Sequence, residues 1–199
     1  MANKTVLVWG HSLIRRMGQY CDEQTSTTNL GFRQDSHSIQ MVGYSGGTID
    51  TLRRYMGDIH FYRPDVICLQ IAGNDLSRPE LTPDVVFKNF TSLIEQLFAA
   101  PFVQYVVVFE LFTRLRTRSH RGDVDIHVYN QRVKELNSRL SSALDGSVFC
   151  KFWRHDRMAD LTRLYDSDGV HFKRQHPYFK SVRGGVLFGL KASDMAPQF

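Results

Sequence analysis

The stretch Asp65-Val-Ile-Cys-Leu-Gln-Ile-Ala-Gly-Asn-Asp75 is the part of the sequence that says most about the fold. Its first part, Val66–Ala72, is an almost continuous apolar run, which is typical of a strand buried on both faces. Strands of this kind belong to parallel sheets, because helices cover both faces of such sheets. The run ends in Gly73-Asn74-Asp75, whose residue types favour a turn and place polar side chains directly after the strand.

Similar apolar runs occur at Thr5–Trp9, Ser38–Val42, Val103–Phe109 and Val148–Phe152. Between the runs, apolar residues recur at helical spacing, and a helix start is marked by Thr82-Pro83-Asp84. The helical stripes are Ile49, Leu52, Met56 and Ile59; Val86, Phe90, Leu93 and Leu97; Tyr129, Val133, Leu136, Leu140 and Leu144; and Phe179, Val182, Val186 and Leu190. Strands that alternate with helices predict an α/β fold with a parallel sheet covered on both faces.

The composition is that of an ordinary globular protein, with 199 residues of which 42% are hydrophobic and 23% charged. This length predicts one domain, which we place at residues 1–192, followed by a short tail at 193–199. No run approaches the roughly 18 uncharged apolar residues of a transmembrane helix. Because Thr5–Trp9 is too short for a signal-peptide core, we expect a cytoplasmic or nuclear location. The three cysteines, Cys21, Cys68 and Cys150, form no C-x-x-C pair, which favours reduced thiols.

Positive charge is concentrated in one loop of a chain whose formal net charge is +5. The segment Leu111–Asp125 is a long irregular connection, and it carries Arg114, Arg116, Arg118 and Arg121. Long loops in compact domains are usually lids or binding loops. We therefore predict that these four arginines bind an anionic substrate or face an anionic surface, with a solvated loop as the alternative.

Four short blocks carry the side chains that chemistry needs, and three of them directly follow predicted strands. The blocks are Gly10-His11-Ser12-Leu13, Gly43-Tyr44-Ser45-Gly46-Gly47-Thr48, Gly73-Asn74-Asp75-Leu76 and Asp168-Gly169-Val170-His171. In an open parallel sheet, functional groups collect at the carboxyl ends of the strands. Together the blocks offer a hydroxyl nucleophile, an imidazole base, a carboxylate to orient the base and donors for an oxyanion, which is the inventory of acyl transfer.

In their order and residue types, the four blocks resemble those of the SGNH, or GDSL-type, hydrolase superfamily, from Val6 to about Leu190. The resemblance implies a flavodoxin-like α/β/α sandwich with a five-stranded parallel sheet. It also implies hydrolysis of a small-molecule or lipid ester, with an acetyl or a longer acyl group, without a metal or organic cofactor. The catalytic residues that it implies are Ser12 as nucleophile, His171 as base, Asp168 as the acid that orients the base, and Gly46 and Asn74 as oxyanion donors.

Two details bear on this resemblance. The stretch Asp65–Asp75 and the segment Val182–Leu190 look like those of a metazoan branch, whose relatives also occur within retrotransposon-encoded proteins. The family usually has Asp before the nucleophilic serine, where this chain has His11. We interpret His11 as a structural replacement for that Asp, with a direct role in proton transfer as the alternative.

Two other interpretations of the sequence stay open. Gly43-Tyr-Ser45-Gly-Gly47 fits the G-x-S-x-G nucleophile elbow between a strand and a helix, so Ser45 is an alternative nucleophile of an α/β-hydrolase. The second alternative is a non-catalytic binding module whose basic loop binds nucleic acid or another anion. No helix-turn-helix signature or RNA-stacking aromatic motif accompanies that loop.

Overall fold

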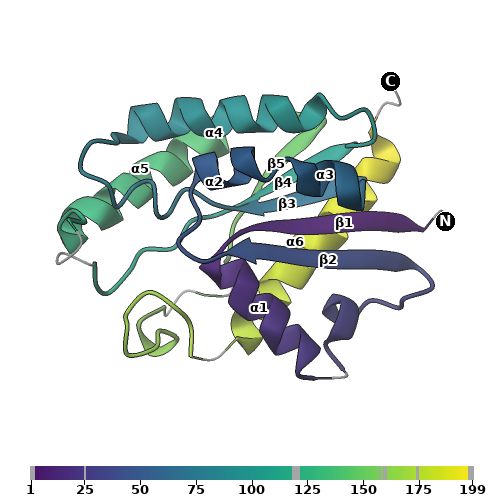
Figure 1. Ribbon diagram of the computed structural model, residues 1–199, viewed down its shortest axis with the longest axis horizontal. Helices are drawn as coiled ribbons and strands as arrows, with labels where there is room; N and C mark the ends of the chain where they lie inside the picture. The colour runs from purple at the N-terminus through teal and green to yellow at the C-terminus, as the bar shows by residue number, and fades with distance from the viewer. Residues whose placement is uncertain are drawn as a thin grey trace.

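Five parallel strands form the centre of the molecule, which is known from a computed structural model that describes residues 3–24, 26–117, 122–156, 158, 161–173 and 175–196. The strands are β1 (Lys4–His11), β2 (His37–Tyr44), β3 (Val66–Gln70), β4 (Tyr105–Phe109) and β5 (Cys150–Trp153). Their order across the sheet is β2-β1-β3-β4-β5, and every neighbouring pair is parallel (Figure 1). The predicted five-stranded parallel sheet of a doubly wound α/β fold is confirmed.

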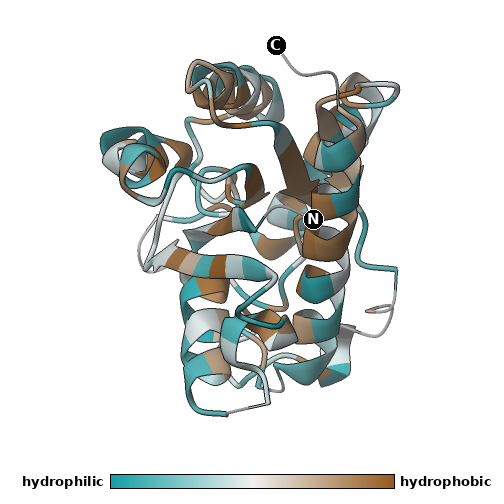
Figure 2. Cartoon of the chain, turned by 90° about the vertical axis from the view of Figure 1, so that its right-hand side faces the viewer, coloured by the Kyte–Doolittle hydropathy of each residue, from teal (hydrophilic) through white to brown (hydrophobic). Residues whose placement is uncertain are grey.

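Helices cover both faces of this sheet and bury one apolar cluster on each side. On one face lie α1 (Ser12–Asp22) and α6 (His176–Met195). On the other lie α2 (Ile49–Arg54), α3 (Gly57–Tyr62), α4 (Pro83–Phe98) and α5 (Ile126–Ala143). Two short 3₁₀ turns complete the described elements, η1 (Thr28–Gly31) and η3 (Leu161–Arg163). Hydrophobic residues gather in the sheet and on the inner sides of the helices, as expected for three packed layers (Figure 2).

The helices differ from the predicted stripes in three places. The stripe from Ile49 to Ile59 forms two short helices instead of one, because the chain leaves helical geometry at Tyr55. The helix α1 also buries a stripe of apolar residues, and no helix was predicted there from the sequence. The last helix continues to Met195, so residues 193–195 are helical although we expected them in a tail.

Close packing between the first helix and the strand ends depends on two glycines. A Cβ atom on Gly10 would lie 2.1 Å from the carbonyl oxygen of Gln70, and one on Gly43 would lie 2.2 Å from the backbone nitrogen of Arg15. Real Cβ atoms do not come this close to backbone atoms. These glycines therefore let α1 start directly against the carboxyl ends of β1, β2 and β3.

Within the described ranges, none of the helices combines the length and the apolar character that crossing a bilayer requires. All three cysteines, Cys21, Cys68 and Cys150, are buried and free.

Candidate active site

The backbone turn before α1 is closed by a histidine. His11 is the N-cap of α1, and its Nδ1 accepts a hydrogen bond from the backbone N–H of Leu13 at 3.3 Å. Burial, together with smaller effects of the charges of Arg114 and His171, lowers the pKa of His11 to about 3. A neutral imidazole can accept this bond, so His11 occupies the capping role that an Asp side chain often takes. This contact favours the structural interpretation of His11 over a role in proton transfer.

A chain of hydrogen bonds joins the first helix to the loop before α6. Ser12 Oγ lies 2.8 Å from Nε2 of His171, and Nδ1 of His171 lies 2.6 Å from Oδ2 of Asp168. Because the Asp168 carboxylate can only accept, Nδ1 carries the ring proton and Nε2 is left as an acceptor for the serine hydroxyl. The arrangement has the chemistry of an activated serine nucleophile.

The carboxylate of Asp168 is held in its ionised form. Partial burial by itself raises its pKa, but hydrogen bonds from the backbone and ring of His171 and from the backbone of Val170 outweigh burial and lower the pKa to about 2. Oδ1 accepts both backbone N–H groups at 2.9 Å. Arg16 lies on the outer side of the same carboxylate, 3.7 Å from Oδ2. The carboxylate is therefore negative at neutral pH.

The turn after β2 brings Gly46 to the same cleft as Ser12. Gly46 has a φ of +67°, in the left-handed region that favours glycine, and the turn is closed by a bond from Gly47 N to Tyr44 O at 3.0 Å. None of the hydrogen bonds within the described part of the chain uses the Gly46 N–H. This N–H is thus available to a ligand bound in that cleft.

The side-chain amide of Asn74 is fixed on both sides. Its Nδ2 donates to the carbonyl oxygen of Gly47 at 2.9 Å, and its Oδ1 accepts from Nη2 of Arg114 at 3.1 Å. A guanidinium only donates and a carbonyl only accepts, so the amide can have one orientation in this network. Nδ2 keeps a second hydrogen, which can be donated to a bound oxygen.

Arg114 owes its own position to several further contacts. Its Nη1 donates to Ser77 Oγ at 2.9 Å, and its guanidinium lies 4.4 Å from the ring centroid of Tyr129. Its backbone exchanges two hydrogen bonds with the side chain of Asn130, at 2.8 and 3.0 Å. These contacts therefore hold the Arg114 side chain inside the site.

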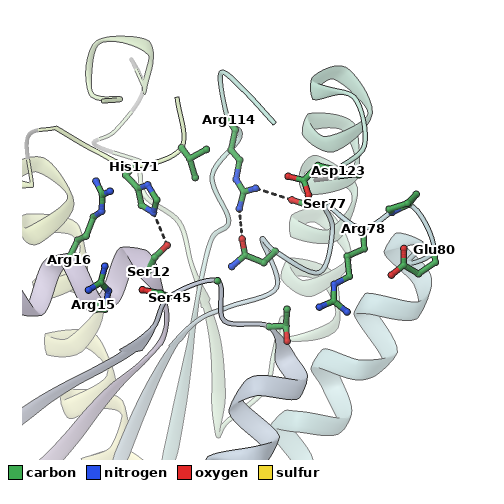
Figure 3. A pocket seen from close by; sticks show the side chains of 16 residues that line it. Ser12, Arg15, Arg16, Ser45, Ser77, Arg78, Glu80, Arg114, Asp123 and His171 are labelled. Atoms are coloured by element: carbon green, nitrogen blue, oxygen red, sulfur yellow. Dashed lines mark hydrogen bonds between the residues drawn. The ribbon is translucent and has the colours of Figure 1, made fainter. Parts of the chain in front are cut away.

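Five of these residues line one cleft of about 740 Å³ at the carboxyl ends of the strands, namely Ser12, Gly46, Asn74, Arg114 and His171. Figure 3 shows Ser12, Arg15, Arg16 and His171 on one side of the cleft and Arg78, Glu80 and Asp123 on the other. Among the described lining residues, Pro79 and Val170 are the only apolar ones apart from glycines. The residues that the structure describes contain no group of three or more His, Cys, Asp or Glu side chains that could hold a metal.

Comparison with known proteins identifies the family of this chain. The model of the GDSL-like Lipase/Acylhydrolase family matches residues 9–175, which include Ser12, Gly46, Asn74, Asp168 and His171. The chain belongs to this family. No curated protein sequence matches the chain significantly.

Solved structures of GDSL-type hydrolases share its fold. A GDSL-like lipase from Bacteroides thetaiotaomicron superposes with a TM-score of 0.71 at 18% identity, over 94% of this chain and 88% of that one. A lipase/acylhydrolase from Enterococcus faecalis gives 0.61 at 13% identity, over 100% and 99%. An acetylxylan esterase from Geobacillus stearothermophilus gives 0.60 at 14% identity, over 97% and 95%. At these identities the likeness concerns the fold.

Of the nine site residues expected from the sequence, the structure brings six into or beside one cleft and leaves one, Arg116, outside it. Ser12, His171, Asp168, Gly46 and Asn74 meet in or beside one cleft. Arg114 also lines the cleft, but it is bonded to protein groups, and Arg116 is outside the lining and packs near Gly169. Arg118 and Arg121 lie outside the described residues. Ser45 is exposed in the turn, and the imidazole of His171 bonds to Ser12.

Sequence reasoning missed several residues that line the cleft. Arg15 and Arg16 line the cleft from α1, and Ser77 and Arg78 line it from the segment after Asn74. A signal for the first two was present, because positions three and four residues after Ser12 lie on the same side of a helix. For Ser77 and Arg78 the sequence carries no comparable signal, since an irregular segment has no period.

Proposed function

We propose that the chain is a serine ester hydrolase in which Ser12 is the nucleophile, His171 the general base and Asp168 the group that orients the base. The observation that carries this proposal is the continuous hydrogen-bonded chain from Ser12 Oγ through both ring nitrogens of His171 to Asp168. Gly46 and Asn74 flank the serine with donors that suit an oxyanion. The family match supports hydrolysis of an acyl ester.

The reaction follows from these positions. His171 Nε2 takes the proton of Ser12 Oγ as the oxygen bonds to the ester carbonyl carbon. The carbonyl oxygen becomes an anion, which the Gly46 N–H, the Ser12 N–H and Asn74 Nδ2 stabilise, and each such donor contributes roughly 3 kcal/mol. The bond to the alcohol oxygen then breaks, and the alcohol leaves with the proton from His171. A water molecule repeats the sequence, which releases the acid and restores Ser12.

The acyl group that fits this site is short. A cavity of about 20 Å³ borders Ser12, and Leu13, Leu111, Phe112 and Val170 are among its lining residues. About 10–15 Å³ of such volume holds one water molecule, so the cavity suits a group about the size of a methyl. The large cleft offers little apolar wall to a fatty chain. We therefore infer that acetyl esters are better substrates than long-chain esters, and kcat/KM for 4-nitrophenyl acetate should exceed that for 4-nitrophenyl octanoate.

A fluorophosphonate probe tests the nucleophile directly, because it reacts covalently with activated serines. Peptide mapping of the labelled wild-type protein should place the adduct on Ser12, and Ser12→Ala should remain unlabelled. An adduct on Ser45 would instead support the alternative elbow. A protein that is never labelled and hydrolyses no ester would support the non-catalytic binding module.

The assignment to a metazoan branch stays a prediction from the sequence, as does the cytoplasmic or nuclear location. No contact in the described cleft adds support to nucleic acid as a partner of the 111–125 loop.

A further inference from the structure

The cleft in front of Ser12 carries an excess of positive charge. Four guanidinium groups line it, against the two carboxylates of Glu80 and Asp123. The guanidinium groups are those of Arg15, Arg16, Arg78 and Arg114. Low-dielectric walls lined by one sign of charge raise the local concentration of oppositely charged ligands.

These four arginines differ in the hydrogen bonds and ion pairs that their guanidinium groups already form. Arg114 donates to Asn74 and Ser77, and Arg16 lies near Asp166 and Asp168. The side chains of Arg15 and Arg78 are exposed, and within the described ranges they form no hydrogen bond or ion pair. Two of the four guanidinium groups are thus free to bind a ligand.

The backbones that carry these two free side chains are well anchored. The N-terminal turn of α1 packs so closely on the end of β2 that a Cβ on Gly43 would meet Arg15 N. Arg132 donates from Nη1 to the carbonyl oxygens of Leu76, Arg78 and Leu81, at 3.3, 2.8 and 3.0 Å. Arg15 and Arg78 therefore project from fixed positions on opposite sides of the cleft (Figure 3).

We propose that the part of the cleft between Arg15 and Arg78 is an anion subsite, so that the preferred substrate is an ester whose alcohol part carries a phosphate or carboxylate group. This proposal rests on the proposed function of the cleft, because it assigns the alcohol side of the same substrate. The methyl-sized cavity beside Ser12 takes the acyl group, and the polar, cationic cleft is left for the alcohol. Guanidinium groups match both anions, since each can donate two parallel N–H bonds.

Three acetyl esters of similar size measure this selectivity. They are methyl 4-acetoxybenzoate, which is neutral, 4-acetoxybenzoate, which has a carboxylate, and 4-acetoxyphenyl phosphate. We expect the ratio of kcat/KM for either anionic ester to that for the neutral ester to fall at least tenfold in Arg15→Gln/Arg78→Gln. The anionic ester whose kcat/KM ratio falls more carries the anion that the subsite prefers. Raising the salt concentration should lower the wild-type ratios as well, because exposed charges are screened.

A matched control removes the same two charges elsewhere. Arg33 and Lys191 are exposed and do not line the cleft, so Arg33→Gln/Lys191→Gln should keep the wild-type ratios. If the cleft variant also keeps both ratios while it hydrolyses the esters, the anion subsite is wrong and the proposed hydrolase stands.

Direct binding separates the two proposals when no ester is cleaved. Phenyl phosphate titrated into Ser12→Ala should bind at least tenfold more tightly than it binds the same protein with Arg15→Gln/Arg78→Gln, as measured by calorimetry. Equal affinities of the two proteins for phenyl phosphate would contradict the proposed subsite. Arginine-dependent binding together with an unlabelled, inactive wild-type protein would retain the subsite and overturn the hydrolase.

Discussion

Ser12–His171 and Ser181–His155 are two serine–histidine pairs with hydrogen bonds of 2.8 and 2.6 Å. They differ in what surrounds the bond. The first pair borders an open cleft, and the second ring nitrogen of His171 bonds to Asp168. In the second pair both residues are buried, and within the described part of the chain Nε2 of His155 has no hydrogen-bond partner. His155 packs against the rings of Phe109, Phe112 and Tyr178.

Under the proposed function, only the first pair has the surroundings that a general base needs. Burial lowers the pKa of His155 to about 3, although a backbone hydrogen bond with Glu110 acts in the opposite direction, so this imidazole stays neutral. The Glu110 carboxylate bonds to the backbone N–H of His155, and in the described contacts no carboxylate bonds to the ring itself. A general base must become positively charged during the reaction, which Asp168 favours at His171. The two pairs therefore differ in their access to the cleft and in the presence of a carboxylate at the second ring nitrogen.

The largest expected effect comes from removing the two hydroxyls separately. Ser12→Ala should lower kcat for 4-nitrophenyl acetate by about 10⁶-fold, because the nucleophile is lost. Ser181→Ala should retain activity and instead lose about 1–3 kcal/mol of stability, since it leaves Nδ1 of His155 buried and unpaired. Steady-state kinetics and urea unfolding of both variants make the test. Loss of activity in folded Ser181→Ala, with Ser12→Ala active, would reverse the assignment of the two pairs.

The next largest effect is expected from Asp168, the carboxylate bonded to the ring of His171. Asp168→Asn should lower kcat about 10⁴-fold, because an amide at this position no longer selects the ring tautomer with the proton on Nδ1. On the same loop, Asp166 bonds to the His171 carbonyl oxygen through its backbone N–H, which Asp166→Asn keeps, so this variant is the matched control for the loss of charge. If both variants are equally active, Asp168 does not orient the base.

A smaller effect tests the donors that face the first pair. Arg114→Gln should lower kcat about 10²-fold, the cost of one lost oxyanion donor, because Asn74 is no longer held in one orientation. KM for a neutral acetyl ester should change much less than kcat, which a direct role of Arg114 in binding that ester would contradict. Arg116→Gln, outside the cleft, serves as the control.

The smallest expected effect concerns the pH dependence of stability that the buried pair causes. The folded-state pKa of His155, about 3, lies below its unfolded value, so the unfolded chain takes up a proton first as the pH falls below about 6.5. Stability is therefore lost on the acid side. Between pH 8 and pH 5, His155→Phe should lose about 2 kcal/mol less stability than the wild type. Urea unfolding at both pH values measures this difference.

Replacement of an exposed histidine, His127→Gln, should leave the same pH dependence unchanged. A wild-type-like pH dependence in His155→Phe would mean that His155 is not the group that takes up this proton.

Most of the fold was predictable because buried parallel strands are nearly continuous apolar runs. Val66–Ala72 identified β3, although the strand ends at Gln70 and Ala72 has a φ of +84° in the turn that follows. The break at Tyr55 was not predictable from hydrophobic spacing, since the apolar period continues across it. Periodicity reports which side of a segment is buried, and it does not report where the backbone hydrogen bonds stop.

The sequence by itself determined which groups meet at one edge of the sheet, because the carboxyl ends of parallel strands lie together and carry whatever follows each strand. Only the tertiary structure decided their pairing. His171 bonds to Ser12 and not to Ser45, and Arg114 turns inward to Asn74 and Ser77. A long side chain on an irregular loop has several partners within reach, and the choice depends on which groups the packed helices and strands bring near it.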